Sequence, residues 1–246
     1  NRQAAVPERL APGDQAGAET LEIMAAAPNY NAWMYDAIAP YLGRSVLEVG
    51  SGIGNMSEQM LKRGVDRLVL TDMDPWYREQ LASRFADRPE VRVDSLMLPD
   101  PDAAARFRDD RLDTIVALNV VEHIEDDIGA LQTMRGMLVS GGRIVILVPA
   151  LQAIYGEMDR QLGHFRRYGR RGLAEVFRRA GFRVDHMAWW NRVGVAGWWF
   201  NGRVRKVSRI PLGQLERFDR LVPLLRLERY LPLPFGQSLI AIGSPA

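Results

Sequence analysis

The 246-residue sequence predicts an α/β protein with a mostly parallel sheet and helices on both of its faces. Short apolar strands alternate with helices from residue 45 to residue 148, and the strand over Arg143–Val148 is apolar after its first residue. Such a strand is typical of a sheet that is covered on both sides. The content of 47% hydrophobic and 25% charged residues excludes a disordered or fibrous chain.

The elements can be assigned in chain order. Apolar residues that recur on one helical face predict a first helix over Tyr30–Leu42. Later helices have recognisable ends, because Pro75 opens one and Gly64 and Gly181 follow two others. The predicted strands are Ser45–Val49, Arg67–Leu70, Val91–Val93, Leu112–Leu118, Arg143–Val148, Phe182–Trp189 and Ser238–Gly243, and the other predicted helices are Asn55–Arg63, Pro75–Phe85, Asp126–Leu138 and Gly172–Ala180.

The chain divides into four parts. Residues 1–27 are rich in Ala, Pro, Gly and Gln and predict a flexible arm. Residues 28–190 hold the β–α units and form the core. Residues 191–234 are an insert rich in Arg and aromatic residues, and residues 235–246 hold the final strand.

Composition excludes several kinds of chemistry. The chain has no Cys, which excludes disulfides and Cys-bound metals, and its three His residues lead us to predict no metal site. Neither a signal peptide nor an apolar stretch long enough to span a bilayer is visible, so a cytoplasmic location is expected. Residues 160–229 carry a net charge of +12 against −10 for the rest, which predicts contact with an anionic partner.

A glycine-rich turn follows the first strand. The segment reads Leu47-Glu48-Val49-Gly50-Ser51-Gly52-Ile53-Gly54-Asn55, with Gly at alternate positions. Glycine permits positive φ and close approach of a ligand to the backbone. The turn lies at the carboxyl end of the strand, where open α/β sheets bind ligands.

An acidic residue ends the second strand. Asp72 follows Gly50 by 22 positions, as expected of a carboxylate that accepts hydrogen bonds from ribose hydroxyls. The dinucleotide spacing would require Gly at the position of Asn55. Glu48 is better suited to a cationic amine than to a pyrophosphate. These residues predict a nucleoside ligand that carries an amine.

With three further segments, this pattern resembles the class I S-adenosylmethionine-dependent methyltransferases. The segments are Val93-Asp94-Ser95, Asn119-Val120-Val121-Glu122-His123 and Ser140-Gly141-Gly142, in the order that the family has them. The resemblance covers residues 28–190 and Ser238–Gly243. It implies a doubly wound, Rossmann-like, seven-stranded sheet with an antiparallel last strand, and makes residues 191–234 a helical insert before that strand.

The resemblance also implies S-adenosylmethionine as the cofactor, with no metal. Glu48 and the glycines would hold the methionine part, Asp72 the ribose, and the residues after the third strand the adenine. The cofactor-binding residues implied are Glu48, Gly50, Ser51, Gly52, Gly54, Asn55, Asp72, Met73, Asp94, Ser95, Leu96, Asn119, Val120 and His123.

Two histidines are candidate catalytic residues. His123 follows the fourth strand and His164 lies in the connection after the fifth, and imidazole can accept a proton near neutral pH. Two alternatives stay open, namely that His123 orders the loop around the cofactor and that His164 packs its own loop. Candidate acceptor-binding residues are Tyr30, Tyr155, His164, Arg167 and Tyr168, with packing as the alternative, whereas Trp33 is assigned to packing.

The resulting hypothesis is methyl transfer to a small-molecule or lipid-like acceptor with an anionic group. The alternatives are a nicotinamide-dependent oxidoreductase and a non-catalytic nucleoside-binding protein. A nucleic-acid acceptor is not expected, because Asn119-Val120-Val121-Glu122 stands where base-amine methylation has an acid-Pro-Pro-aromatic sequence. The insert, residues 191–234, is interpreted as a lid, a homodimer interface, a peripheral membrane contact or ordinary packing.

Overall fold

The computed structural model describes residues 27–200, 212–231 and 233–246. Of the predicted arm over residues 1–27, only residue 27 is described. Residues 201–211 of the insert, which include Arg203, Arg205 and Lys206, also lie outside the described residues. The strands are β1 Ser45–Val49, β2 Arg67–Thr71, β3 Val91–Asp94, β4 Thr114–Leu118, β5 Arg143–Pro149, β6 Phe182–Trp190 and β7 Ser238–Pro245. The helices are α2 Pro28–Ile38, α3 Asn55–Lys62, α4 Pro75–Arg84, α5 Ala103–Arg106, α6 Asp127–Met137, α7 Glu157–Gln161, α8 Arg170–Arg179, α9 Gly194–Trp199 and α10 Leu212–Leu225.

The seven strands form one sheet in the order β3-β2-β1-β4-β5-β7-β6. Neighbours are parallel except where β7 pairs antiparallel with both β5 and β6. The predicted doubly wound fold with an antiparallel last strand is confirmed. The chain order reverses between β1 and β4, and ligands bind at such a switch point, outside the carboxyl ends of the strands.

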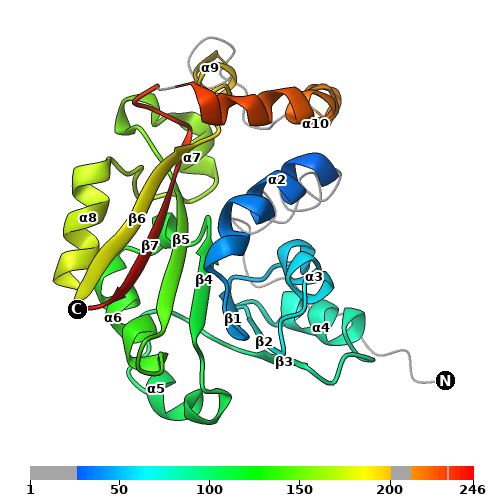
Figure 1. Cartoon of the computed structure of the whole chain (residues 1–246), viewed down its shortest axis with the longest axis vertical. Coiled ribbons are helices and arrows are strands. Elements are labelled where there is room, and N and C mark those ends of the chain that lie inside the picture. The colour runs from blue at the N-terminus through cyan, green and yellow to red at the C-terminus, as the bar shows by residue number, and fades with distance from the viewer. Residues whose placement is uncertain (1–26, 201–211, 232) are drawn as a thin grey trace.

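Helices cover both faces of the sheet (Figure 1). Side chains alternate along each strand, so Ile144 and Ile146 enter the core beneath α5, α6 and α8, whereas Val145 and Leu147 enter the core with α2, α3 and α4. The apolar strand β5 is buried from both sides, as its sequence predicts.

Several short elements were not predicted. The connection over residues 150–169 contains the 3₁₀ turn Gln152–Ile154 and helix α7, and the segment after β3 contains α5 and the turn Arg108–Asp110. Elements of three to five residues contain too little of a helical period to show an apolar face. The first helix begins at Pro28 and ends at Ile38, followed by the 3₁₀ turn Ala39–Tyr41, and the remaining differences are shifts of one or two residues at element ends.

The described part of the insert lies over the carboxyl edge of the sheet. Helix α10 packs against α2 (Figure 1). The buried carboxylate of Asp219 accepts hydrogen bonds from the backbone N–H groups of Tyr30 at 2.8 Å and Asn29 at 3.4 Å. It thereby caps a helix that has no capping side chain of its own. Among the described residues, no helix is long and apolar enough to cross a membrane.

Candidate functional site

The turn after β1 needs its glycines. Gly50, Gly52 and Gly54 have φ values of 66°, 52° and 82°. A Cβ atom on Gly50 would lie 2.8 Å from Val120 Cγ2, and one on Gly54 would lie 2.8 Å from the ring of Phe85. Backbone conformation and close packing both select glycine here, so the turn brings its main chain to the switch point without side chains in the way.

Glu48 is buried at the end of β1. It is 4% exposed, and its carboxylate accepts a hydrogen bond from the Ser57 hydroxyl at the start of α3. Burial raises the pKa of Glu48 to about 7, with the Ser57 and Ser51 hydroxyls acting against this and nearby Asp72 adding to it. A cation bound beside Glu48 would restore its negative charge.

Asp72 holds the glycine turn in place from the end of β2. Its two carboxylate oxygens accept hydrogen bonds from the N–H groups of Gly52 and Asp74, each at 3.0 Å. Burial raises its pKa, and these two backbone donors act in the opposite direction. A carboxylate offers about four acceptor positions, so Asp72 keeps two for a ligand.

The end of β3 combines a tethered acid with an exposed methionine. The Asp94 carboxylate accepts hydrogen bonds from Arg92 and from the N–H group of Ser95, the latter at 2.7 Å. Leu96 is 4% exposed and belongs to the core, whereas Met97 is 67% exposed. Met73, after β2, is also 67% exposed. Met97, which the sequence analysis did not select, is therefore a better candidate than Leu96 for contact with a flat apolar ligand.

The end of β4 supplies a strained residue and a buried acid. Asn119 has a φ of 55°, and its N–H donates to the Leu147 carbonyl at 2.8 Å. The 3₁₀ turn Val121–His123 follows, with Glu122 completely buried. Burial raises the pKa of Glu122 to about 8, although its own backbone N–H and then the charge of Arg167 act against this. No role for Glu122 was predicted from the sequence, where the only signal was a Glu-His pair directly after a strand.

The two candidate catalytic histidines lie together. The rings of His123 and His164 are nearly perpendicular, with centroids 4.7 Å apart. One ligand atom from each of His123, His164 and Glu122 lies within 4.8 Å of the others, a set that could hold a metal ion. The surrounding atoms and the facing His164 lower the pKa of His123 to about 4, although its side chain is partly open to solvent.

A buried network positions His164. Its Nδ1 lies 3.1 Å from Asp159 Oδ1, which also accepts a hydrogen bond from Arg167 Nε at 2.7 Å. Arg167 is 4% exposed and also donates to the Ala150 carbonyl. The Tyr155 hydroxyl donates to the His164 carbonyl at 2.7 Å. Asp159 was not recognised in the sequence.

Three of the predicted acceptor-binding residues have packing roles in this structure. Tyr168 is 4% exposed, and its hydroxyl donates to Asp127 at 2.9 Å. Arg167 is held in the Asp159 ion pair. The Tyr30 ring packs against Trp190 and Phe218, with centroids 5.2 and 6.0 Å away. Acceptor contact by Tyr155 and His164 stays a prediction, and Trp33, buried against Trp190, packs as predicted.

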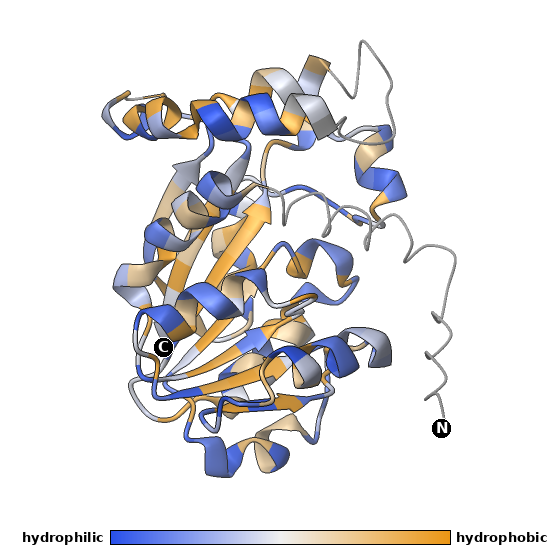
Figure 2. Cartoon of the chain, turned by 90° about the vertical axis from the view of Figure 1, so that its right-hand side faces the viewer, coloured by the Kyte–Doolittle hydropathy of each residue, from blue (hydrophilic) through white to orange (hydrophobic). Residues whose placement is uncertain are grey.

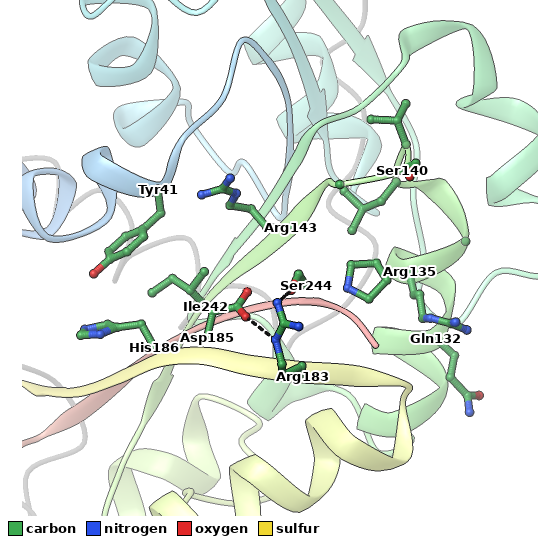
Figure 3. Close-up of a pocket in the computed structure, with 15 residues that line it drawn as sticks. Tyr41, Gln132, Arg135, Ser140, Arg143, Arg183, Asp185, His186, Ile242 and Ser244 are labelled. Carbon is green, nitrogen blue, oxygen red and sulfur yellow. Dashed lines mark hydrogen bonds and ion pairs between the residues drawn. The ribbon is translucent and has the colours of Figure 1, made fainter.

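The described residues line a cavity beside the insert and another beside the sheet. One of about 460 Å³ lies between the insert and the loop before α7, and its lining is apolar except for Arg192. The larger one, of about 830 Å³, lies at the amino ends of β5 and β6, with Arg143, Arg183 and His186 on its wall (Figure 3). It is on the edge of the sheet opposite the glycine turn, where parallel sheets do not bind ligands.

The glycine turn at the β1–β4 switch point and the two buried acids are typical of nucleoside-binding α/β proteins of Rossmann-like topology. A family model described as a methyltransferase domain matches residues 7–187. The chain belongs to this family, the class I S-adenosylmethionine-dependent methyltransferases. The resemblance seen in the sequence is thereby confirmed.

Similar proteins differ in what they act on. The chain is 27% identical over 150 residues to the tRNA U34 carboxymethyltransferase of Psychrobacter arcticus, covering 57% of this chain and 43% of that protein. It is 31% identical over 106 residues to the ubiquinone biosynthesis O-methyltransferase of Cereibacter sphaeroides, covering 43% of this chain and 41% of that protein. The chain spans less than half the length of these relatives.

Solved structures share the fold. A Haloferax volcanii methyltransferase, in complex with its Trm112 activator, superposes with a TM-score of 0.62 at 18% identity over 95% of this chain and 96% of that one. The geranyl diphosphate C-methyltransferase of Streptomyces coelicolor gives 0.61 at 13% identity over 87% of this chain and 77% of that one. At these identities the likeness describes the fold alone.

Proposed function

We propose that the chain transfers the methyl group of S-adenosylmethionine to a small-molecule or lipid-like acceptor with an anionic group. The observation that carries the cofactor half is the turn of three positive-φ glycines between the buried carboxylates Glu48 and Asp72. Glu48 is complementary to the amine of the cofactor, and Asp72 to its ribose hydroxyls. A nicotinamide dinucleotide would instead bring a pyrophosphate toward Glu48, which is unfavourable.

The acceptor half rests on the apolar cavity beside the insert. Its wall contains Ile154, Trp199 and Phe235, with Arg192 as the charged residue. This lining suits an apolar body. The Arg192 guanidinium donates to the Leu233 carbonyl at 3.3 Å and lies 3.6 Å from the Glu228 carboxylate, so an anionic group of the acceptor would share this guanidinium with Glu228. Displacement at a sulfonium is accelerated mainly by positioning, and His123 and His164 are suited to orient the acceptor.

The insert is proposed to rest on an anionic lipid surface. Of twelve exposed large hydrophobic residues in the described part of the chain, nine lie between Val193 and Leu233. Figure 2 shows hydrophobic and hydrophilic segments interleaved along α10. Exposed Arg217, Arg220 and Arg229 accompany them. Apolar side chains bordered by cations are typical of a helix in a membrane interface.

Vesicle sedimentation tests this contact. We expect salt-sensitive binding to vesicles that contain anionic lipid, and loss of binding when Leu224→Glu and Leu227→Glu are combined, because both side chains are exposed. Gln80→Glu with Ser83→Glu on α4 adds the same charge far from the insert and should leave binding unchanged. Self-association that is lost in the insert variant, with no lipid binding, would identify a homodimer interface instead.

Transfer RNA is a second candidate acceptor. It is favoured by the relative named as a tRNA U34 carboxymethyltransferase and by the net charge of +12 over residues 160–229. Against it stands the apolar cavity, which offers no complement to a phosphate backbone.

Two measurements test the proposal. S-Adenosylhomocysteine should raise the melting temperature whereas NAD should not, because only a ligand that binds the folded state stabilises it. Methyl-labelled S-adenosylmethionine should then be incubated with an anionic lipid extract and, separately, with bulk tRNA, using Asp72→Ala as the inactive control. Label in lipid supports the proposal, label in tRNA overturns its acceptor half, and no stabilisation by S-adenosylhomocysteine overturns its cofactor half.

A further inference from the structure

A carboxylate and two imidazoles converge beside the end of β4. Glu122 and His123 come from the 3₁₀ turn after the strand, and His164 follows α7, some forty positions later in the chain. One ligand atom from each lies within 4.8 Å of the other two. The fold brings these residues together from two separate loops.

Glu122 has no hydrogen-bond partner in the described structure. It is 0% exposed, and neither of its carboxylate oxygens makes a hydrogen bond with another residue of the described structure. Buried carboxyl groups are ordinarily hydrogen-bonded or paired, because burial without a partner is costly. The Glu122 carboxylate lies next to the two histidines. A positively charged group that pairs with it there would lie between the three side chains.

The neighbouring arginine does not complete Glu122. Arg167 donates from Nε to Asp159 and from a terminal nitrogen to the Ala150 carbonyl, and its guanidinium lies 4.6 Å from the centroid of the Trp198 ring. Its hydrogen bonds are directed at Asp159 and the backbone. Because Arg167 is paired with Asp159, it makes no hydrogen bond to the Glu122 oxygens.

Asp159 orients His164 toward the cluster. The distance from Asp159 Oδ1 to His164 Nδ1 is 3.1 Å, and the other Asp159 oxygen accepts from the Gly156 N–H at 2.9 Å. When Nδ1 donates to the carboxylate, Nε2 keeps its lone pair free. A carboxylate behind a histidine is the arrangement that orients metal-binding imidazoles in proteins.

We propose that Glu122, His123 and His164 bind one divalent first-row transition cation. Two imidazole nitrogens and one carboxylate are a donor set that Mn²⁺, Fe²⁺ and Zn²⁺ accept, and three protein ligands leave coordination positions open. His123 is the exposed member of the three, so the cluster is accessible from solvent on its side. This replaces the sequence-based prediction of no metal site, which rested on there being only three histidines.

The cation would bind an anionic oxygen of the acceptor beside the cofactor. This part rests on the proposed function, whereas binding of the cation does not. Val120, two residues before Glu122, lies beside Gly50, where an added Cβ atom would be 2.8 Å from Val120 Cγ2, so the cluster and the glycine turn share one edge of the sheet. A metal there would give the acceptor a fixed anchor close to the glycine turn.

Titration of the chelator-treated, tag-free full chain with ZnCl₂ by calorimetry, and with MnCl₂ by electron paramagnetic resonance, tests the proposal. We expect one bound equivalent, and at least about tenfold weaker binding in Glu122→Gln, which keeps the shape of the side chain. Asp159→Asn should weaken binding about 10- to 100-fold, as loss of a group that orients a ligand does. His186→Ala is the matched control, because it removes the one histidine outside the cluster.

The outcomes separate this inference from the proposed function. Absence of saturable Zn²⁺ and Mn²⁺ binding, or unchanged binding in Glu122→Gln, overturns the metal site. Should Glu122→Gln fail to fold, His123→Ala replaces it, since His123 is exposed, and unchanged binding in that variant overturns the site equally. Binding of S-adenosylhomocysteine to the metal-free chain is read separately. Metal binding without cofactor binding would contradict the proposed function but not the metal site.

Discussion

The two halves of the carboxyl edge of the sheet are built differently. On the β1–β2 side, Glu48 and Asp72 are buried but already accept hydrogen bonds from Ser57, Gly52 and Asp74. On the β4–β5 side, Glu122 is buried, and its carboxylate has no hydrogen-bond partner among the other described residues. The first half is organised before its ligand arrives, whereas the second is incomplete. On the proposed function, this difference means that cofactor binding is preorganised and that the acceptor side depends on what binds there.

The largest expected effect would sharpen this contrast on the acceptor side. We expect His164→Ala to lower methyl transfer by up to about 10²–10⁴-fold if the imidazole moves a proton or holds the acceptor. S-Adenosylhomocysteine affinity should stay nearly unchanged, because His164 is held by Asp159 and Tyr155 and not by the glycine turn. Steady-state turnover and calorimetry measure the two quantities.

The outcome for His123 completes this test. Its loss should reduce cofactor affinity as well as turnover, since it follows Asn119 and Val120 at the edge of the turn. Full turnover in His164→Ala would make that residue a packing residue and remove the distinction between the two histidines.

Asp72→Ala should produce the next largest effect, confined to the cofactor side. Loss of charged hydrogen bonds to the ribose, and of the acceptor for the Gly52 N–H, should weaken S-adenosylhomocysteine binding by about 1–3 kcal/mol. Calorimetry measures the change. Asp126→Ala is the control, because Asp126 caps α6 and accepts from Gly129 at 2.9 Å in an exposed position. Equal affinities in the two variants would contradict the assignment of Asp72.

The pH dependence of cofactor binding should be smaller. Because the pKa of Glu48 is about 7, the residue is increasingly protonated below that pH and cannot pair with the cofactor amine. Affinity should fall toward a limit of about tenfold per pH unit below 7. The sign is opposite for stability of the free chain. The pKa of Glu48 in the folded chain lies above its ordinary value of 4.5. The free energy of unfolding of the ligand-free chain should therefore increase as the pH falls from about 7 to 4.5.

Calorimetric titration with S-adenosylhomocysteine at pH 6, 7 and 8 measures the dependence. Glu48→Gln should weaken binding and remove most of the dependence between pH 6 and 7. A native affinity that does not change over that interval would show that Glu48 does not meet the amine in its ionised form.

The smallest expected effect lies outside both halves. Asp219→Ala should lower the free energy of unfolding by about 1 kcal/mol, because the first turn of α2 loses its cap. Chemical denaturation measures this loss. Cofactor affinity should stay unchanged, and a large loss of affinity would show that α10 and α2 belong to the cofactor site.

Contiguous features of the site could be predicted from the sequence. The glycine turn and Asp72 are recognisable because each follows its strand directly. The alternation of strands and helices along the chain predicted the order of the core elements. Glu122, Asp159 and His164 were not recognised as a group, because they meet only when two loops fold together. Arg167 and Tyr168 were predicted on the acceptor side from their position after β5, but ion pairing with Asp159 and hydrogen bonding to Asp127 bury them. Position along a chain does not say which way a side chain turns.

The cap that Asp219 provides for α2 bears on the time course of biosynthesis. The N–H groups of Asn29 and Tyr30 find their acceptor 190 and 189 positions further along the chain. At ribosomal rates of about 5–20 residues per second, that interval lasts roughly 10–40 seconds. Throughout it, the apolar face of α2, with Trp33 and Ile38, can pack on the growing sheet while its first turn stays open. A nascent chain stalled before α10 would thus display an unfinished helix, the kind of surface that chaperones bind.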